Sequence, residues 1–271
     1  MQVRFFNGGY CRQLLALVDR RTWRFAKVQA VFLAIHHPRE GWVLVDTGYG
    51  GQFFNATRSW PFRFYRWIIP ATPAGPTSDT LSQAKIDPSE IRHLVVTHFH
   101  ADHIGGLAEF PHAQIHYHEN ARVPLQALSP IAQCRAAFLP KFVPPWLQKQ
   151  SRIISADAFR VSSLPFGTFD LFGDGLIDLV DLPGHAPGHL GLRFSSQGRE
   201  YLYATDAFWE TAQIEEAVDP FGFVLNFEWS PAEYKKTIQD LRALAAVRKY
   251  EIVSCHAQKT QAVVARGCAS I

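Results

Sequence analysis

The chain has 271 residues, of which 47% are hydrophobic and 19% are charged, and its formal net charge is +3. This composition excludes a disordered chain and predicts a soluble, globular protein with a sizeable core. The mildly positive charge does not require a nucleic-acid partner. No apolar stretch approaches the roughly 18 residues of a membrane span, and the apolar run at residues 14–18 is too short for the core of a signal peptide.

The four cysteines, at positions 11, 134, 255 and 268, form no CxxC pair and no spacing typical of a disulfide-rich protein. Cysteines used in this way fit a reducing compartment. Together with the lack of a signal-peptide pattern, they predict a cytoplasmic location.

The first elements expected along the chain are two strands, at residues 28–35 and 41–48, which a His-His-Pro turn joins into a hairpin. The second strand contains Asp46 near its end. Residues 53–69 then interleave aromatic side chains with arginines, and a proline-rich linker extends this segment to residue 76. We interpret 53–76 as a lid; the aromatic part could also be a dimer contact, ordinary core or a membrane-surface contact.

A short helix is expected at residues 80–84, and residues 87–90 have the Asp-Pro-Ser-Glu order that caps a helix. The β-branched run at 91–97 predicts a buried strand. These elements lead directly into the most informative part of the chain.

The densest group of metal-ligating side chains follows this strand and comprises His98, His100, Asp102 and His103. Side chains two apart in an extended chain point the same way, so His98 and His100 could hold one cation while Asp102 and His103 face a neighbouring position. Imidazole and carboxylate without thiolate suit zinc, and iron, manganese or nickel nearly as well. The glycines at 105 and 106 should let the backbone pass close to the metals.

Residues 114–118 alternate like a further strand, which places His116 and His118 on one face as a weaker candidate ligand pair. Residues 120–170 contain repeated prolines, which break helices and cannot donate to a sheet. We therefore expect an irregular cap over 120–170 beside the site, where such segments usually set substrate choice.

Strand character returns from residue 177 and continues through 191–194 and 201–205. Residues 230–233 form a capping box with proline at the first helical position, and apolar residues recur behind it at helical spacing. A final strand is expected at 252–256. Strands and helices are therefore mixed, and no internal repeat is present.

These motifs together resemble the metallo-β-lactamase superfamily. The HxHxDH pattern lies at 98–103, a GHxPGH-like segment at 184–189, an acid ending a strand at Asp206, and a histidine ending the last strand at His256. The resemblance implies an αββα sandwich, with two mixed sheets flanked by helices, formed by residues 1–271 as a single domain. It also implies two divalent metal ions, with zinc as the first expectation, held by His98, His100, Asp102, His103, His185, Asp206 and His256.

The resemblance also assigns supporting roles. Asp206 would bridge the two metals, Asp46 would orient a metal-bound histidine, and His189 would support the site without binding metal. Because neighbours in a strand point to opposite faces, Cys255 should face the other layer when His256 faces the metals. We therefore do not expect Cys255 to be a ligand.

The implied reaction is hydrolysis, in which a metal-bridging hydroxide attacks the substrate and Asp102 relays a proton to the leaving group. The segment spacing is most similar to the lactonase-type branch, which opens homoserine-lactone rings. That branch has a tyrosine three residues after the bridging aspartate, where this chain has Trp209. An indole N–H can donate a hydrogen bond but cannot replace the acid chemistry of a hydroxyl. Trp209 and Phe208 are candidate substrate contacts.

The predicted substrate is a small lactone or ester with an apolar acyl group, because the lid and cap supply aromatic and aliphatic residues with few acids. The alternative is a phosphodiesterase or thioesterase of the same superfamily. A redox di-iron protein is disfavoured because that branch replaces a motif histidine by an acid, whereas His100 is present here. A noncatalytic domain is disfavoured because all seven expected ligands are intact. Residues 53–69 could also form a homodimer contact.

Overall fold

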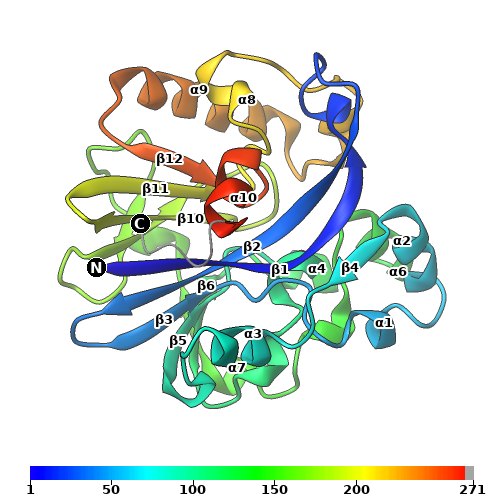
Figure 1. The fold of residues 1–271 in the computed structure, drawn as a ribbon, viewed down its shortest axis with the longest axis horizontal. Coiled ribbons are helices and arrows are strands. Elements are labelled where there is room, and N and C mark those ends of the chain that lie inside the picture. Colours follow the sequence, from blue (N-terminus) through cyan, green and yellow to red (C-terminus); the bar gives the residue numbers. More distant parts are fainter. Residues whose placement is uncertain (266–271) are drawn as a thin grey trace.

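Two β-sheets packed face to face form the centre of the computed structural model, which describes residues 1–265 (Figure 1). One sheet has seven strands in the order β4-β1-β2-β3-β5-β6-β7, and the other has five in the order β12-β11-β10-β9-β8. Helices lie outside the two sheets, so the predicted αββα sandwich is confirmed. The strands are β1 (Gln2–Leu14), β2 (Phe25–His37), β3 (Gly41–Val45), β4 (Ala71–Pro73), β5 (Ile91–Val95), β6 (Gln114–His118), β7 (Ser151–Ile154), β8 (Thr168–Asp170), β9 (Ile177–Asp181), β10 (Leu190–Ser196), β11 (Arg199–Thr205) and β12 (Glu251–Ser254).

The predicted hairpin is present as β2 and β3, which pair antiparallel, whereas β3, β5, β6 and β7 run parallel. The long strand β1 was not predicted. Its pairing with β2 shifts register between Asn7 and Tyr10, so its apolar residues do not alternate along the whole strand. Gly8 lies at this shift against Gly48, where an added Cβ would be 2.4 Å from the Cα of Gly48. The two glycines therefore let the two backbones touch.

The lid and cap segments contain short elements. Residues 53–76 form α1 (Phe53–Ala56), α2 (Phe62–Ile68) and β4. Residues 120–170 form α5 (Val123–Gln126), α6 (Pro130–Arg135), α7 (Leu147–Gln150) and 3-10 turns, but also β7 and β8. The expectation of an irregular cap is therefore wrong at two places, because β7 extends the larger sheet beside β6 and β8 ends the smaller sheet beside β9. Both strands are too short to show a periodic pattern.

The predicted C-terminal amphipathic helix is α9 (Pro231–Val247), which covers the five-stranded sheet together with α8 (Ala212–Glu215) (Figure 1). Its predicted inward face is confirmed for Tyr234, Ile238 and Leu241, which are buried. The Ser230 side chain makes no capping hydrogen bond, so the expected capping box is wrong in that detail. The proline at the first helical position starts the helix without it.

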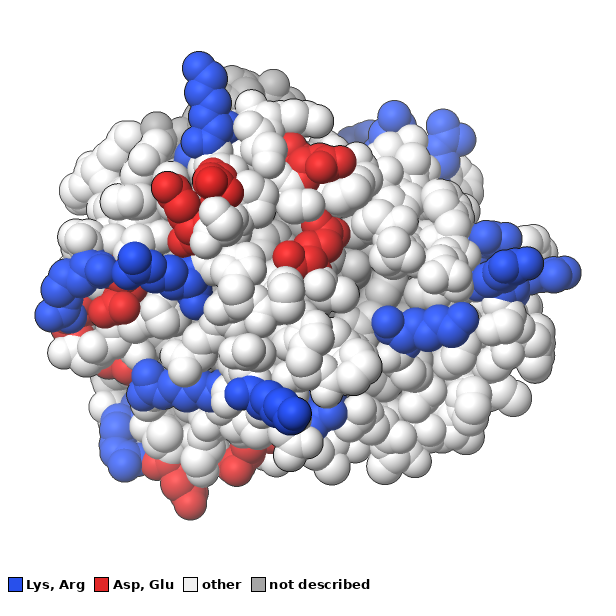
Figure 2. All heavy atoms as spheres, turned by 90° about the horizontal axis from the view of Figure 1, so that it is seen from below, with Lys and Arg blue, Asp and Glu red and all other residues white. Residues whose placement is uncertain are grey.

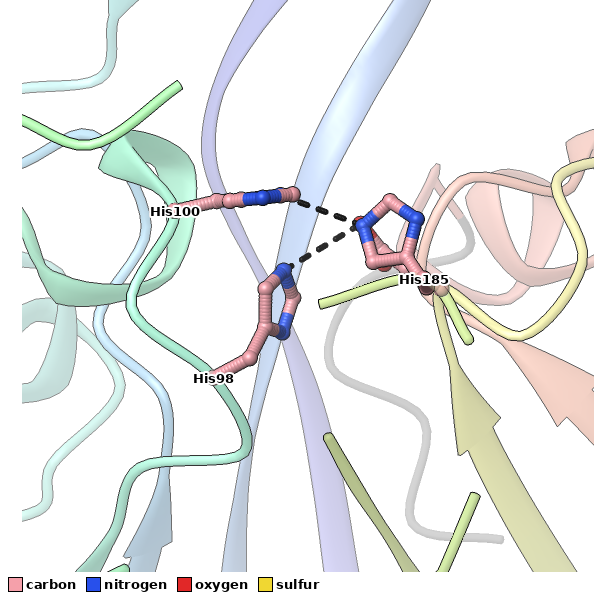
Figure 3. A group of neighbouring side chains, drawn as sticks. His98, His100 and His185 are labelled. Atoms are coloured by element: carbon pink, nitrogen blue, oxygen red, sulfur yellow. Dashed lines mark hydrogen bonds and ion pairs between the residues drawn. The ribbon is translucent and has the colours of Figure 1, made fainter. Parts of the chain in front are cut away.

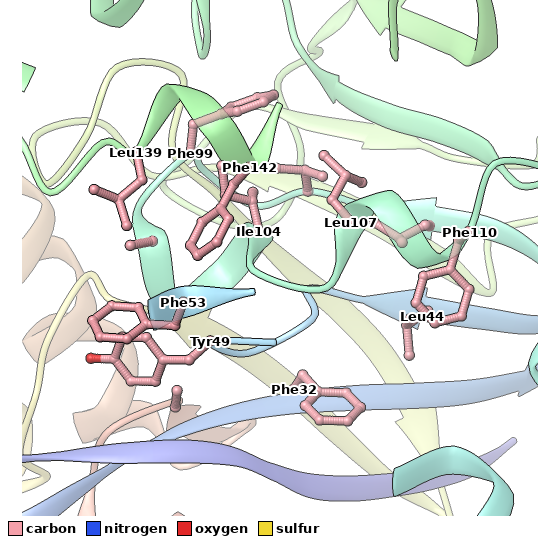
Figure 4. Packing of buried hydrophobic residues seen from close by; sticks show 14 of the residues in the cluster. Phe32, Leu44, Tyr49, Phe53, Phe99, Ile104, Leu107, Phe110, Leu139 and Phe142 are labelled. Carbon is pink, nitrogen blue, oxygen red and sulfur yellow. The ribbon is translucent and has the colours of Figure 1, made fainter. Parts of the chain in front are cut away.

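The outer face of the seven-stranded sheet packs on the metal-motif segment and on α3 (Thr77–Gln83). Figure 4 shows Phe32 and Leu44 of the sheet with Phe99, Ile104 and Leu107 from the segment that carries the HxHxDH motif. These residues are fully buried. Phe99 lies between His98 and His100, and Ile104 and Leu107 follow the motif, so these side chains anchor the segment in the core while its histidines face the site.

No helix within residues 1–265 is both long enough and apolar enough to cross a membrane.

Candidate metal centre

The HxHxDH segment follows β5, as the sequence predicted: it begins three residues after β5 ends and leads into the short helix α4 (Ala101–Ile104). The backbone of Asp46 at the end of β3 donates to the carbonyl of Val95, and Thr47 donates to the carbonyl of His103. Parallel strands place their carboxyl ends at one edge of a sheet. The predicted site therefore lies at the edge where β3 and β5 both end.

One group of donors comprises His98, His100, His185 and Asp206, whose ligand atoms all lie within 4.8 Å of one another. The three imidazoles converge from the motif segment and from the loop after β9 (Figure 3). His185 Nε2 lies 3.1 Å from His100 Nδ1 and 3.3 Å from Asp206 Oδ2. The fold thus brings together residues that are more than 100 positions apart.

A second group adjoins the first and comprises His103, Asp206, Cys255 and His256, again within 4.8 Å of one another. Asp206 Oδ2 lies 3.3 Å from His103 Nε2 and 3.2 Å from His256 Nε2. Asp102 Oδ2 lies 3.5 Å from His256 Nε2 and 3.9 Å from His103 Nε2. All seven predicted ligands therefore lie together, and Asp206 belongs to both groups.

The outward ring nitrogen of four histidines is held by the protein, which fixes each tautomer and leaves the other nitrogen for the site. The contacts are His98 Nδ1 to Thr97 Oγ1 at 3.1 Å, His103 Nδ1 to Asp46 Oδ2 at 2.7 Å, His185 Nδ1 to Glu228 Oε2 at 2.8 Å, and His256 Nδ1 to the Gln29 carbonyl at 2.8 Å. These four histidines present Nε2 to the centre, whereas His100 presents Nδ1.

The donor set fits two divalent cations. The Nε2 atoms of His98 and His103 are buried and have no hydrogen-bond partner among residues 1–265. A buried polar atom without a partner costs free energy, and these two point at the shared oxygen of Asp206. Imidazole and carboxylate donors suit zinc and its first-row neighbours.

The pKa values of the site follow from burial and charge. Burial holds the pKa of His98 and of His100 well below the usual value, so both rings are neutral at pH 7 and offer lone pairs. Burial alone would raise the pKa of Asp206, but the neighbouring His256 and His103 outweigh it and hold that pKa well below its usual range. The central carboxylate is therefore ionised.

Asp46 lies where the resemblance placed it, behind His103. It is fully buried, its Oδ2 accepts from His103 Nδ1 at 2.7 Å, and its oxygens also accept from the Thr97 amide and hydroxyl. His189 also lies behind the site: Nδ1 donates to the Leu182 carbonyl at 2.8 Å, and Nε2 lies 2.6 Å from Thr205 Oγ1. Both of its ring nitrogens are therefore engaged by the protein.

Cys255 does not face the other layer, so that prediction is wrong. Its thiol is fully buried beside Asp206 Oδ1 and donates to it. Burial, and then the nearby Asp206 charge, raise the pKa of the thiol, which keeps its proton. The alternation rule fails because β12 ends at Ser254, so Cys255 and His256 lie in a bend of the chain and not in a strand.

The glycines after the motif also serve a different purpose from the predicted one. An added Cβ on Gly105 would lie 1.9 Å from the Tyr49 carbonyl oxygen, and one on Gly106 would meet Thr77. They therefore allow the loop after β3 to pack on the end of α4. This contact fixes the Asp46 loop against the motif rather than bringing backbone to the metals.

The other candidate residues are placed as follows. Phe208 is fully buried in the core under α9. Trp209 packs on His256 with 4.9 Å between ring centroids, and its Nε1 is buried without a hydrogen-bond partner among the described residues. His116 Nε2 lies 3.0 Å from His93 Nδ1, and His118 Nδ1 accepts from the Asn120 amide. The candidate pair, His116 and His118, belongs to no possible metal group within residues 1–265.

A cavity of about 220 Å³ opens beside His100 and His185. Its apolar walls come from the cap and from the loop before α9, and include Leu125, Leu128, Ala132, Ala136, Phe227 and Trp229. Residues 53–69 and Trp209 do not line it. The cap therefore lines the cavity, as predicted. The lid segment and Trp209, which were also expected to contact the substrate, do not line this cavity.

Glu228 is a functional candidate that sequence reasoning missed. Burial lowers the pKa of His185, but the Glu228 carboxylate and then Asp206 outweigh it and raise that pKa to about 9. Glu228 lies between a short turn and α9, in a stretch with no periodicity and no motif. Only the fold brings it 2.8 Å from His185 Nδ1.

Glu228→Gln should weaken metal binding about 10- to 100-fold, the usual cost of removing a carboxylate that orients a metal-bound histidine. The amide keeps the shape but removes the charge that supports His185. Competition with a chelating dye would measure the change. Glu233→Gln, at an exposed position on α9, is the matched control and should bind metal like the wild type. Equal affinity in both variants would rule out this role for Glu228.

The chain belongs to the metallo-beta-lactamase superfamily, whose family model matches residues 25–255. The probable metallo-hydrolase Rv2300c of Mycobacterium tuberculosis is 33% identical over 186 residues, which are 65% of this chain and 56% of that protein. The N-acyl homoserine lactonase AttM of Azorhizobium caulinodans is 29% identical over 63% of this chain and 60% of its own length. The matched region thus spans less than two thirds of these relatives.

Solved structures of similar fold include AiiA of B. thuringiensis with N-decanoyl-L-homoserine bound at the active site. Its TM-score is 0.72 at 18% identity, covering 100% of this chain and 97% of that one. A probable metal-dependent hydrolase from Staphylococcus aureus has a TM-score of 0.72 at 14% identity, covering 94% of this chain and 89% of the other. At these identities the likeness establishes the fold, and the lactonases among the sequence relatives agree with the lactonase-type resemblance.

Proposed function

We propose that this chain is a dinuclear metal-dependent hydrolase that opens a lactone or ester with an apolar acyl group. One observation carries the proposal: a single oxygen, Asp206 Oδ2, faces the Nε2 atoms of four histidines from both donor groups. The distances are 3.7 Å to His98, 3.3 Å to His103, 3.3 Å to His185 and 3.2 Å to His256. A carboxylate that belongs to both groups is suited to bridge two adjacent cations.

Two divalent cations, most simply zinc, would supply Lewis acidity and a nucleophile at neutral pH. His98, His100 and His185 would hold one, His103, His256 and Asp102 the other, with Asp206 between them. Neutral imidazoles and ionised carboxylates are the forms that bind metal. The rigid outer contacts of these side chains favour a site that needs little rearrangement during the reaction.

The proton required by the leaving alkoxide is assigned to Asp102. Its carboxylate is at the edge of the second group and remains 14% exposed, so it can reach both the site and the substrate side. One oxygen would help to hold the cation, while the other would take the proton that the attacking water releases and pass it to the leaving alkoxide. The indole of Trp209 cannot perform this acid chemistry, which the lactonase branch gives to a tyrosine hydroxyl.

The acyl group is assigned to the cavity beside His100 and His185. Its aliphatic and aromatic walls favour an apolar group next to the metals. The names of the relatives support this class, since they include acyl homoserine lactonases. An ester or lactone carbonyl at the mouth of the cavity would lie beside the first donor group.

Side-by-side kinetics of the zinc-loaded chain test this assignment. We expect the highest kcat/KM for acyl-homoserine lactones, followed by aryl esters, with an aryl thioester and an aryl phosphodiester below them. If the phosphodiester exceeds the lactone by tenfold or more, about 1.4 kcal/mol of transition-state preference, the enzyme is a phosphodiesterase instead. A thioester leading by the same margin would likewise replace the lactone.

The proposal includes a single catalytic domain over residues 1–271 and a cytoplasmic location. The ligands span residues 98–256 and come from the edges of both sheets, so neither half of the chain holds a complete site. The cysteines within residues 1–265 are free thiols, which supports a reducing compartment.

A further inference from the structure

The short helix α2 and the turn before it expose large aromatic side chains. Trp60 is 71% exposed and Trp67 is 77% exposed, and Phe54, Phe64 and Ile68 are also among the exposed large apolar residues. A groove of about 510 Å³ is lined by Trp60, Arg63, Phe64, Arg66, Trp67 and Pro70. We call the six residues that line this groove, together with Arg58, the α2 surface. An exposed apolar patch of this kind marks an interaction site.

The arginines of the α2 surface are not neutralised by the protein. Arg58, Arg63 and Arg66 take part in no ion pair within residues 1–265, and Arg66 lies over the ring of Phe54 at 5.7 Å. The sequence from residue 47 to residue 78 contains no aspartate or glutamate. The surface therefore carries uncompensated positive charge among aromatic rings.

The neighbouring cap extends this basic region. The helix α6 contacts α2, and the two lie together at one end of the molecule (Figure 1). Residues 120–156 also contain no acid, but five lysines or arginines. In Figure 2 the right-hand end, where α1 and α2 lie in Figure 1, displays Lys and Arg and no Asp or Glu on that face.

We propose that the α2 surface docks on an anionic lipid bilayer. Arginines beside tryptophan and phenylalanine form the composition of a segment that lies in the membrane interface, where the rings enter the headgroup region and the cations meet anionic lipids. A second copy of the chain fits less well. A two-fold interface places the same patch on itself, which would bring these arginines together without a carboxylate.

The α2 surface lies close to the cavity beside His100 and His185. Ala132 and Arg135 of α6 line the cavity beside His100, while the same helix contacts α2. Docking would therefore hold the mouth of that cavity near the bilayer, where amphiphilic acyl compounds partition. The docking proposal is independent of the proposed reaction, so its test does not depend on hydrolysis.

Co-sedimentation of the full zinc-loaded chain with vesicles tests the proposal. We expect binding to vesicles of equal parts phosphatidylcholine and phosphatidylglycerol, little binding to pure phosphatidylcholine, and a loss of binding as salt rises. The double variant Arg63→Gln with Arg66→Gln should lower the partition coefficient more than tenfold, since each basic residue near such a surface contributes about 1 kcal/mol, or roughly fivefold.

Trp67→Ser should also lower the partition coefficient, without changing the circular dichroism or the melting temperature, because the side chain is exposed. Trp23→Ser is the matched control: Trp23 is 71% exposed, lies against Phe221 and should leave binding unchanged. Equal binding to both kinds of vesicle, or to neither, would overturn the proposal. Light scattering that finds two chains, which Trp67→Ser converts to one, would assign the surface to a homodimer instead.

Discussion

Asp206→Asn should lower kcat/KM for the preferred ester or lactone on the order of 10³-fold. Removal of one preorganised electrostatic group in an active site already costs about 10²- to 10³-fold, and Asp206 faces both donor groups. The neutral amide also removes the negative charge between two proposed cations. Elemental analysis should find about two metal equivalents in the wild type and fewer in the variant. A variant with two equivalents and wild-type kinetics would contradict the bridging role.

Cys255 supplies the control for this experiment, because its thiol touches the other oxygen of the same carboxylate. We expect Cys255→Ala to keep both metals, since the thiol donates to Asp206 Oδ1 and the second cation has His103, His256, Asp102 and Asp206 as its proposed ligands. In the cobalt-substituted wild type, a sulfur-to-metal charge-transfer band should be absent. Such a band, or the loss of one metal in Cys255→Ala, would make Cys255 a ligand of the second site.

The sequence predicted which side chains the fold brings together at the candidate site, because their spacing and their positions at strand ends are visible in a single sequence. His98 to His103 follow the recognisable strand β5, Asp206 follows β11, and His256 comes just after β12. The rule of alternation is reliable only within a strand, which is why it failed at Cys255, one residue beyond β12. A motif can therefore locate ligands while leaving the direction of their neighbours undetermined.

What the sequence could not predict depends on contacts between distant segments. Glu228 has no local signal, and its role arises only when the loop before α9 closes on His185. The strand β1 was hidden by its register shift at Gly8, whose reason is the close approach of Gly48. Likewise, Gly105 is explained by the Tyr49 carbonyl and not by the metals. Such contacts between distant segments leave no periodic pattern in a single sequence.

The buried carboxylate of Asp46 should support both the fold and the second metal, and two substitutions separate these effects. Asp46→Ala removes the acceptor of three hydrogen bonds, from the Thr97 amide, the Thr97 hydroxyl and His103. Removing one partner of such a buried, charge-assisted arrangement costs about 3–5 kcal/mol. Urea unfolding of chelator-treated protein should show this loss, independent of metal.

Asp46→Asn should keep most of the stability but disable the second site. The Thr97 amide donates to Oδ1, which fixes the oxygen of an asparagine there and places its NH₂ group opposite His103 Nδ1. His103 must then accept at Nδ1 and carry its proton on Nε2, so Nε2 can no longer bind a cation. We expect about one metal equivalent and a kcat/KM that is lowered about 10- to 100-fold, the usual cost of losing the hydrogen-bond partner of a metal-bound histidine. Two equivalents with unchanged kinetics in Asp46→Asn would show that Asp46 serves packing alone.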